Sequence, residues 1–236
     1  MFFIQKRTIY IVLGIIILIP FIIKFFYNKN NIEEVSYLPI TNRVIGIDPG
    51  HGGVDPGAVG TSGVVEDEIN LQIALKLKRL IEQSGGIAIM TREADEGLYT
   101  DKSKTLGEKK SEDLKNRNLL IEDADCELFI SIHLNSFTDP KYYGAQAFYM
   151  EEDEESLKLG EIVQKELKNT LDKENNRKPA SRDDIYLLKN SNIPSLLVEV
   201  GFLSNPLEEK ILQTEEYQEK IAWSIYTGIM KYLNDE

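Results

Sequence analysis

The chain has 236 residues, enough for one sizeable domain with a short appendage but not for two full domains. Its composition, 42% hydrophobic and 28% charged, is that of a folded globular protein and argues against wholesale disorder and against a polytopic membrane protein. The net charge of -12, without a cluster of lysines and arginines, argues against nucleic acid as a partner. The single cysteine, Cys126, excludes an intrachain disulfide.

The N-terminal segment predicts a membrane anchor. Residues 8–26 are almost entirely apolar, and their number is close to the roughly 20 that a helix needs to cross a bilayer. Lys6 and Arg7 precede this run and favour an orientation with the N-terminus in the cytoplasm. We therefore expect a cytoplasmic segment at 1–7, a transmembrane signal anchor at 8–26 and a tether at 27–42, with the rest of the chain outside the cytoplasm. Secretion after signal cleavage is the alternative, but no small-x-small cleavage site follows the apolar run.

From residue 43 onward, apolar runs typical of strands alternate with segments of helical periodicity. This alternation predicts one α/β domain at 43–236, with a mostly parallel, twisted sheet of about six strands flanked by helices. The strands are expected at 44–47, 87–90, 128–132, 145–150, 185–188 and 195–200, and the helices at 68–83, 112–123, 154–171 and 215–233. The polar stretches 94–110 and 172–184 break the alternation and are expected to be surface loops that could rim a site.

The chain contains two histidines, and both stand where a predicted strand ends. His51 lies in a glycine-rich loop after the first strand, and His133 closes an apolar run at 129–132. Because ligands bind at the carboxyl ends of the strands in open α/β sheets, we expect the two imidazoles to lie close together. Catalytic zinc sites take three protein ligands from histidine and carboxylate, with water in the open position. A carboxylate is therefore needed to complete such a site.

Two sets of acidic residues are candidates for this chemistry. Glu66, Asp67 and Glu68 stand at the start of a predicted helix, and their spacing leaves the choice of ligand open, because acids in the first turn also favour the helix dipole. Glu199 interrupts an otherwise apolar strand. A carboxylate buried there should have a raised pKa and could act as a general acid and base.

Several separated motifs resemble one family of enzymes. They are IGIDPGHGGVDPGAVG at 45–60, VEDEINLQIA at 65–74, TR at 91–92, Arg117, FISIHLNS at 129–136 and PSLLVEVGFLSNPLEE at 194–209. In this order they resemble the zinc-dependent N-acetylmuramoyl-L-alanine amidases of the Amidase_3 type, over nearly the whole chain from residue 43. The resemblance implies that Zn²⁺ is bound by His51, Glu66 and His133, and that Glu199 is the catalytic glutamate.

The same resemblance implies the partners of the site. The substrate is expected to be peptidoglycan glycan strands with their stem peptides, cut between N-acetylmuramic acid and L-alanine. Asn70, Arg92 and Asn135, which stand in the motifs, are expected to bind substrate or to support the ligands. The membrane is a further partner through the N-terminal helix, and an activating protein is another candidate.

The short chain, the single hydrophobic N-terminal helix and the lack of a wall-binding repeat resemble the spore-cortex amidases of endospore formers. In that group, cleavage precedes the formation of muramic δ-lactam, which germination requires. Vegetative wall turnover or cell separation is the alternative role. A glycosidase and an inactive wall-binding protein are the rival classes; loss of activity on chelation would exclude the first, and the presence of all four key residues argues against the second.

Overall fold

The computed structural model describes residues 6–29 and 37–235, which divide into two compact units at Tyr37 and Leu38. The N-terminal unit contains α1 (Lys6–Lys29), which has Pro20 inside it. Within the described residues, no helix combines the length with the apolar character that crossing a bilayer requires. The segment predicted as a transmembrane anchor, 8–26, is thus helical but is not supported as a membrane span.

Much of the predicted N-terminal layout lies outside the described residues, namely 1–5 of the cytoplasmic segment and 30–36 of the tether. The second unit begins at Leu38, and Ile40 is already fully buried in its core. The last residues of the predicted tether therefore belong to the globular unit.

A mixed sheet forms the centre of the second unit. Its strands are β1 (Val44–Pro49), β2 (Ile87–Met90), β3 (Leu128–Asn135), β4 (Gln146–Tyr149), β5 (Ala180–Ser181) and β6 (Ser195–Phe202), in the order β2-β1-β3-β6-β4-β5. All neighbouring pairs are parallel except β4 and β6, which are antiparallel. The predicted mostly parallel sheet of six strands is confirmed. The carboxyl ends of β1, β3 and β6 consequently meet at one edge of the sheet.

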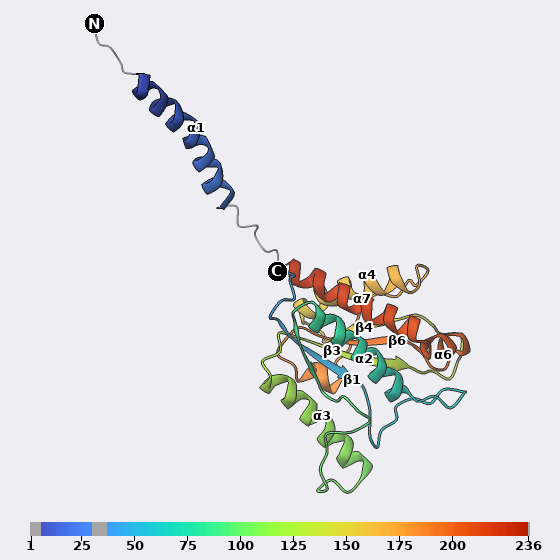
Figure 1. The fold of residues 1–236 in the computed structure, drawn as a ribbon. Coiled ribbons are helices and arrows are strands. Elements are labelled where there is room, and N and C mark those ends of the chain that lie inside the picture. Colours follow the sequence, from blue (N-terminus) through green and yellow to red (C-terminus); the bar gives the residue numbers. More distant parts are fainter. Residues whose placement is uncertain (1–5, 30–36, 236) are drawn as a thin grey trace. The chain divides into compact units, whose positions relative to one another are not determined.

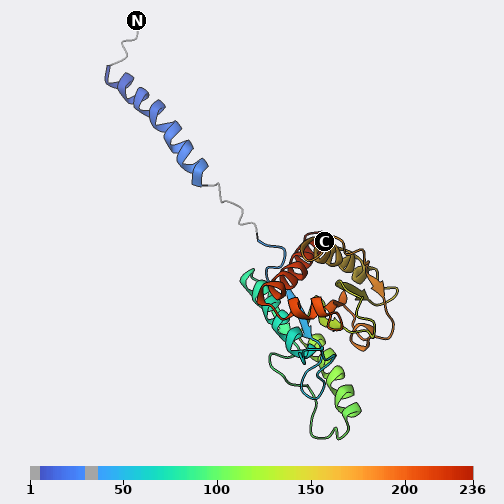
Figure 2. The ribbon, with the colours of Figure 1, turned by 90° about the vertical axis from the view of Figure 1, so that its right-hand side faces the viewer.

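Helices cover both faces of this sheet (Figure 1). The helices α2 (Glu66–Gln83), α4 (Glu154–Thr170) and α7 (Glu215–Asn234) pack on one face, while α3 (Leu106–Asp123) and the short α5 (Tyr186–Lys189) pack on the other. A further short helix, α6 (Pro206–Leu212), follows β6 directly. Figure 2 shows the same domain from the side, with α3 apart from α4 and α7. The sheet is thus the middle layer of three.

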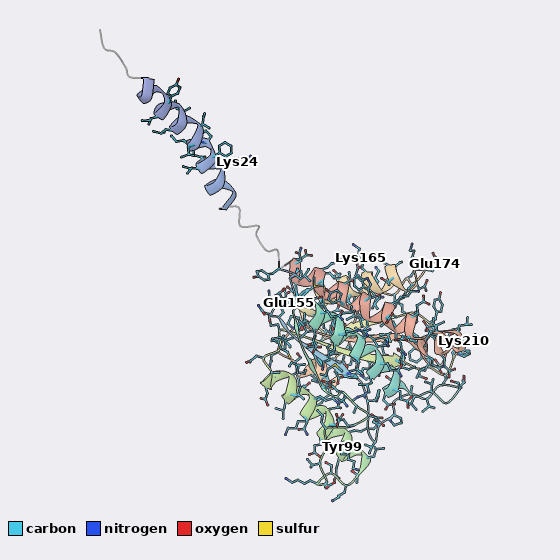
Figure 3. The ribbon with its side chains drawn as sticks, in the orientation of Figure 1. Lys24, Tyr99, Glu155, Lys165, Glu174 and Lys210 are labelled. Carbon is cyan, nitrogen blue, oxygen red and sulfur yellow. The ribbon has the colours of Figure 1, made fainter. Side chains whose placement is uncertain are left out.

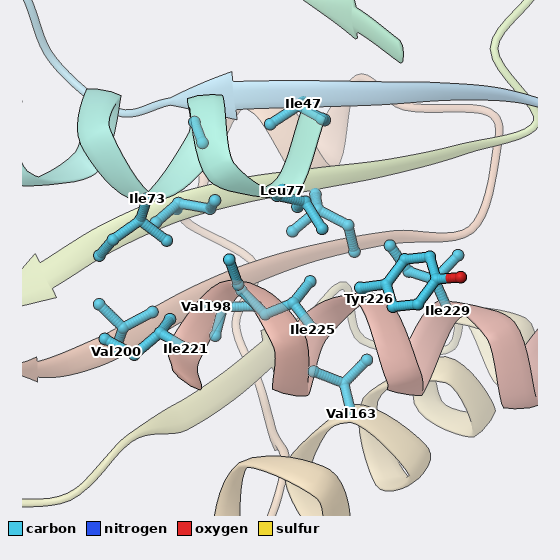
Figure 4. Close-up of a cluster of buried hydrophobic side chains, with 14 of the residues drawn as sticks. Ile47, Ile73, Leu77, Val163, Val198, Val200, Ile221, Ile225, Tyr226 and Ile229 are labelled. Carbon is cyan, nitrogen blue, oxygen red and sulfur yellow. The ribbon is translucent and has the colours of Figure 1, made fainter. Parts of the chain in front are cut away.

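The larger core lies between the sheet and α2, α4 and α7 (Figure 4). Leu77, Val198 and Ile225 meet there from three elements and are each fully buried. Burial of one such side chain contributes roughly 1.5–3 kcal/mol. A smaller cluster on the opposite face packs Ile121 of α3 against Phe129 of β3. Charged side chains such as Lys165, Glu174 and Lys210 are exposed on the outer surface (Figure 3).

Three predicted segments differ from the structure, and the differences have identifiable reasons. The segment 185–188, predicted as a strand, instead forms the N-cap, Ile185, and the first three residues of α5, where Leu187 and Leu188 are buried. A four-residue apolar run does not distinguish a strand from one helical turn. The helix predicted at 112–123 begins earlier, at Leu106, where Thr105 and Glu108 form a reciprocal capping box. The stretch 172–184, predicted as a loop, contains the short edge strand β5.

Candidate metal centre and catalytic site

Three side chains from different elements converge at the carboxyl edge of the sheet. His51 follows β1, His133 lies in β3, and Glu66 is the first residue of α2. The Nε2 atom of His51 lies 3.3 Å from Oε1 of Glu66, and the Nδ1 atom of His133 lies 3.1 Å from the same oxygen. One ligand atom from each residue lies within 4.8 Å of the other two. The parallel pairing of β1 with β3 brings the two histidines together, as expected from the sequence.

Glycines make room for this convergence. A Cβ atom on Gly50 would lie 2.2 Å from Cε1 of His133, and one on Gly57 would lie 2.6 Å from Oε2 of Glu66. His51 itself has a φ of 64°, a left-handed conformation that is costly for a residue with a side chain. The surrounding structure must therefore hold this residue in place.

Two buried arginines provide that support. Arg92 donates from Nε to the carbonyl of Pro49 at 2.9 Å and from Nη2 to that of Gly50 at 3.0 Å. Arg117 donates from Nη2 to the carbonyl of His51 at 2.7 Å. Three successive carbonyls are thus bound by guanidinium groups, a set of contacts that a planar fork of donors can make and a single ammonium cannot. We call this arrangement the arginine clamp.

The structure separates the three residues predicted as substrate-binding or supporting positions. Asn70 is fully buried and donates to the Gly50 carbonyl and to Oε1 of Glu66, both at 3.3 Å. Asn70 and the buried Arg92 both donate to the Gly50 carbonyl and thus hold the segment beside His51 in place. Asn135 lies at the end of β3, and its Oδ1 accepts a hydrogen bond from the backbone of Ser136. None of the hydrogen bonds described for Asn135 joins it to the three converging residues.

Of the three acidic residues at the start of α2, only Glu66 faces the two histidines. Glu66 points at both imidazoles, and its two oxygens also accept hydrogen bonds from the backbone of Leu134 and Ala58. Among the described residues, the group that could hold a metal ion contains Glu66 but neither Asp67 nor Glu68. Although burial alone would raise the pKa of Glu66, the two histidines lower it well below its usual range. This carboxylate is therefore negatively charged over the physiological range.

Asp55, which the sequence analysis missed, orients His51. Its Oδ2 lies 3.0 Å from Nδ1 of His51, and its Oδ1 is 2.8 Å from Nζ of Lys110. Burial acts against protonation of His51, but the hydrogen bonds to Asp55 and Glu66 outweigh it and raise the pKa to about 10. The same negative charges would favour a cation between the ligands. A carboxylate on Nδ1 also leaves Nε2 directed at the cluster, as in histidine ligands of zinc.

Glu199 lies beside this cluster on β6, directly opposite His133 in the β3–β6 register. Among the described residues, its buried Oε2 has no hydrogen-bond partner. Burial disfavours the charged form and, with repulsion from Glu66, raises the pKa of Glu199 to about 7, although His133 and His51 act in the opposite direction. A carboxyl group that titrates near neutral pH is suited to take up and release a proton during a reaction.

Two imidazoles and one carboxylate are the donor set of catalytic zinc sites, which keep a fourth position open. Glu199, whose buried Oε2 has no hydrogen-bond partner among the described residues, stands opposite His133 in the sheet. The residues present therefore fit zinc. The layered α/β domain thus carries, at the carboxyl edge of its sheet, a group of side chains that could hold a metal ion beside a buried carboxyl group, an arrangement compatible with a hydrolase.

Comparison with known proteins then identifies the family. The sequence model described as N-acetylmuramoyl-L-alanine amidase, Amidase_3, matches residues 45–231. The chain belongs to the N-acetylmuramoyl-L-alanine amidase family, which confirms the resemblance noted in the motifs.

Individual relatives agree with this assignment. The germination-specific N-acetylmuramoyl-L-alanine amidase of Bacillus subtilis is 40% identical over 225 residues, which covers 95% of this chain and 93% of the relative. The CwlD amidase from Clostridioides difficile, solved in complex with the GerS lipoprotein, is 53% identical with a TM-score of 0.81, covering 83% of this chain and all of that one. The amidase AmiC2 of Nostoc punctiforme is 30% identical with a TM-score of 0.70, covering 81% and 97%.

Proposed function

We propose that this chain is a zinc-dependent amidase that hydrolyses the bond between N-acetylmuramic acid and L-alanine in peptidoglycan. The observation that carries the proposal is the convergence of His51, Glu66 and His133, whose ligand atoms lie within 4.8 Å of one another beside Glu199. Family membership supports the class of bond that is cut. In this proposal the three converging side chains hold zinc and Glu199 transfers protons.

When bound, the zinc ion supplies Lewis acidity toward water and toward the scissile carbonyl. Glu199 accepts a proton from the attacking water, whose oxygen bonds to the lactyl carbon. The carbon–nitrogen bond then breaks, and Glu199 returns the proton to the departing amine of L-alanine. The arginine clamp and Asn70 hold the ligands in position, which avoids reorganisation during the reaction.

Chelation tests the requirement for metal. We expect a strong chelator to abolish cleavage of purified peptidoglycan, and a slight excess of zinc over the chelator to restore it. Mass spectrometry of the products should show new amino-terminal alanine. New reducing ends instead of stem peptides with amino-terminal alanine would assign the chain to the glycosidases, which need no metal. Full activity after verified removal of bound metal would contradict the proposed chemistry.

Gly50→Ala should weaken zinc binding without unfolding the protein. The added methyl group would lie 2.2 Å from the ring of His133, so the imidazole must move away from the other two ligands. We expect zinc affinity to fall at least about 10–100-fold, as for other changes that disturb ligand orientation. Zinc titration with a competing chelator measures the affinity, and thermal unfolding checks the fold.

Gly107→Ala is the matched control, because a Cβ atom at Gly107 would meet nothing within 4 Å. It adds the same methyl group in the first turn of α3, and zinc affinity should be unchanged. Equal zinc affinity of the Gly50 and Gly107 variants would exclude His133 as a ligand in the arrangement described.

We further propose that the catalytic domain acts outside the cytoplasm, in the cell envelope or between the forespore and mother-cell membranes, and serves spore-cortex maturation and germination. The 40% identical germination-specific amidase supports this role. Deletion of the gene in its host should then yield spores whose cortex lacks muramic δ-lactam. A normal cortex together with unseparated vegetative cells would favour wall turnover instead.

A protein partner is part of this proposal, because the CwlD amidase was solved in complex with the GerS lipoprotein. Affinity purification of the tagged chain from sporulating cells, followed by mass spectrometry, should recover a partner. Recovery of the chain alone under conditions that preserve its activity would contradict this part of the proposal.

A further inference from the structure

A small cavity lies next to the proposed catalytic site. It has a volume of about 290 Å³ and opens between the segment that follows β3 and the segment that follows α4. Tyr142 and Tyr143 line it from the first segment, and Asn175, Asn176 and Arg177 line it from the second. Glu174, exposed in Figure 3, also borders it. The cavity therefore combines aromatic rings with amide and guanidinium groups.

One side chain separates this cavity from Glu199. Arg177 donates from Nη1 to Oε1 of Gln146 at 2.9 Å. Gln146 in turn stands directly opposite Glu199 in the antiparallel β4–β6 pair, where Cβ atoms are typically about 4.5–5.5 Å apart. The wall of the cavity is thus linked through Gln146 to the strand position of Glu199.

The walls of the cavity are held rigidly although they expose aromatic surface. The Gly144 amide donates to Oε1 of Glu208 at 3.0 Å, and Arg177 donates from Nε to the Tyr143 carbonyl at 2.9 Å. Asn175, which is buried, donates to the carbonyl of Ala145 at 2.8 Å. Tyr143 is nevertheless 52% exposed and Tyr142 is 40% exposed. The backbone that carries the two rings is thus held in place, and the Tyr142 ring also packs against Phe137 and Phe202. A preorganised backbone lowers the entropy that is lost when a ligand binds.

We infer that this cavity binds an N-acetylated sugar of the glycan strand, adjacent to the muramic acid whose peptide is removed. This inference rests on the proposed function. A pyranose ring presents an apolar face of C–H groups, which packs on an aromatic ring, and an edge of hydroxyl and acetamido groups, which Asn176 and Arg177 can meet with hydrogen bonds. The glycan strand continues on both sides of the muramic acid that carries the scissile bond, and Arg177 in the wall of this cavity bonds Gln146, which stands opposite Glu199.

The size of the cavity favours a sugar over a protein. Stable protein interfaces bury about 800 Å² on each partner across a broad surface. A concave cavity with convergent polar groups is instead the form of a small-molecule site. The glycan strand offers one such unit at each step along its length.

Binding of peptide-free glycan tests the inference independently of cleavage. We would measure the Kd of the full-length, zinc-loaded protein for peptide-free peptidoglycan glycan strands of defined length by calorimetry. Tyr143→Ala should weaken binding about tenfold, which corresponds to the loss of one aromatic contact. Tyr143→Phe, which keeps the ring, should bind like the wild type. Trp223→Ala is the matched control, since Trp223 is 51% exposed on α7, and it should leave Kd unchanged.

Kinetics supply a second readout. On long strands with stem peptides, Tyr143→Ala should raise KM and leave kcat nearly unchanged, whereas cleavage of a single N-acetylmuramoyl peptide should be unaffected. If glycan binds as described but no peptide is released by the wild type, the proposed function fails and the sugar site stands. Absence of glycan binding by the wild type, equal Kd for Tyr143→Ala, or loss of a protein partner in this variant with glycan binding intact would each overturn the inference.

Discussion

Glu199→Gln should lower kcat for peptidoglycan cleavage by about 10²–10⁴-fold while the protein keeps its zinc. Glutamine has nearly the same shape as glutamate, but its amide cannot accept the proton of the attacking water. The buried Oε2 of Glu199 has no hydrogen-bond partner among the described residues, so it is available to the attacking water. Single-turnover kinetics measure the chemical step, and elemental analysis gives the zinc content.

Glu166→Gln is a suitable control for this experiment. Glu166 is also buried, but it lies on α4 and pairs with Lys231 of α7, on the face of the sheet that α2, α4 and α7 cover. Its replacement makes the same chemical change and should leave turnover near that of the wild type. Cleavage by Glu199→Gln at a rate close to that of Glu166→Gln would show that Glu199 is not the proton carrier.

Arg117→Met should destabilise the protein by about 3–5 kcal/mol, because it leaves the charge of Asp48 buried without its cation. Asp48 is fully buried, and its Oδ1 lies 2.7 Å from Nη1 of Arg117. The hydroxyls of Thr91 and Ser131 would remain as its hydrogen-bond donors. Urea denaturation monitored by circular dichroism measures the change. The paired variant Asp48→Asn with Arg117→Met should lose less than Arg117→Met alone, since no unpaired charge is then buried.

The same ion pair sets a pH dependence. Burial by itself raises the pKa of Asp48, but Arg117, Ser131 and Thr91 outweigh it and lower the pKa to about 2. The value in the unfolded chain is about 4. The stabilisation is therefore complete above about pH 4 and is lost as the pH falls through about 2. Lys220→Met, which removes an exposed pair with Glu216, is the control for Arg117→Met. Because that pair is exposed to solvent, its loss should change the stability and its acid limb far less.

Much of the fold was predictable because its strands are long apolar runs separated by helical periodicity. The runs at β1 and β3 predicted that both histidines lie at one sheet edge, and the run at β6 predicted that Glu199 is buried in a strand. Short elements were less predictable. Residues 185–188 pack against α3 as a helical turn, which depends on tertiary contacts, whereas the start of α3 could have been found from the spacing of Thr105 and Glu108.

The supporting residues of the site were only partly visible in the sequence. Asp48, like Glu199, is a carboxylate within an apolar strand, and the same reasoning would have marked it as buried and paired. Its partner Arg117 lies 69 positions further on, and no local pattern joins the two. The contact of Asp55 with His51 likewise depends on the turn of the intervening glycines. Distances between loops, rather than composition, determine these contacts.

The arginine clamp contributes both to the stability of the fold and to the geometry of the active site. Arg117 neutralises Asp48 in the interior and, with the same guanidinium group, fixes the backbone of His51. Selection for folding alone would then preserve the left-handed bend even in a descendant that no longer cleaves peptidoglycan. Such a descendant would keep the backbone frame of the site after losing its ligands.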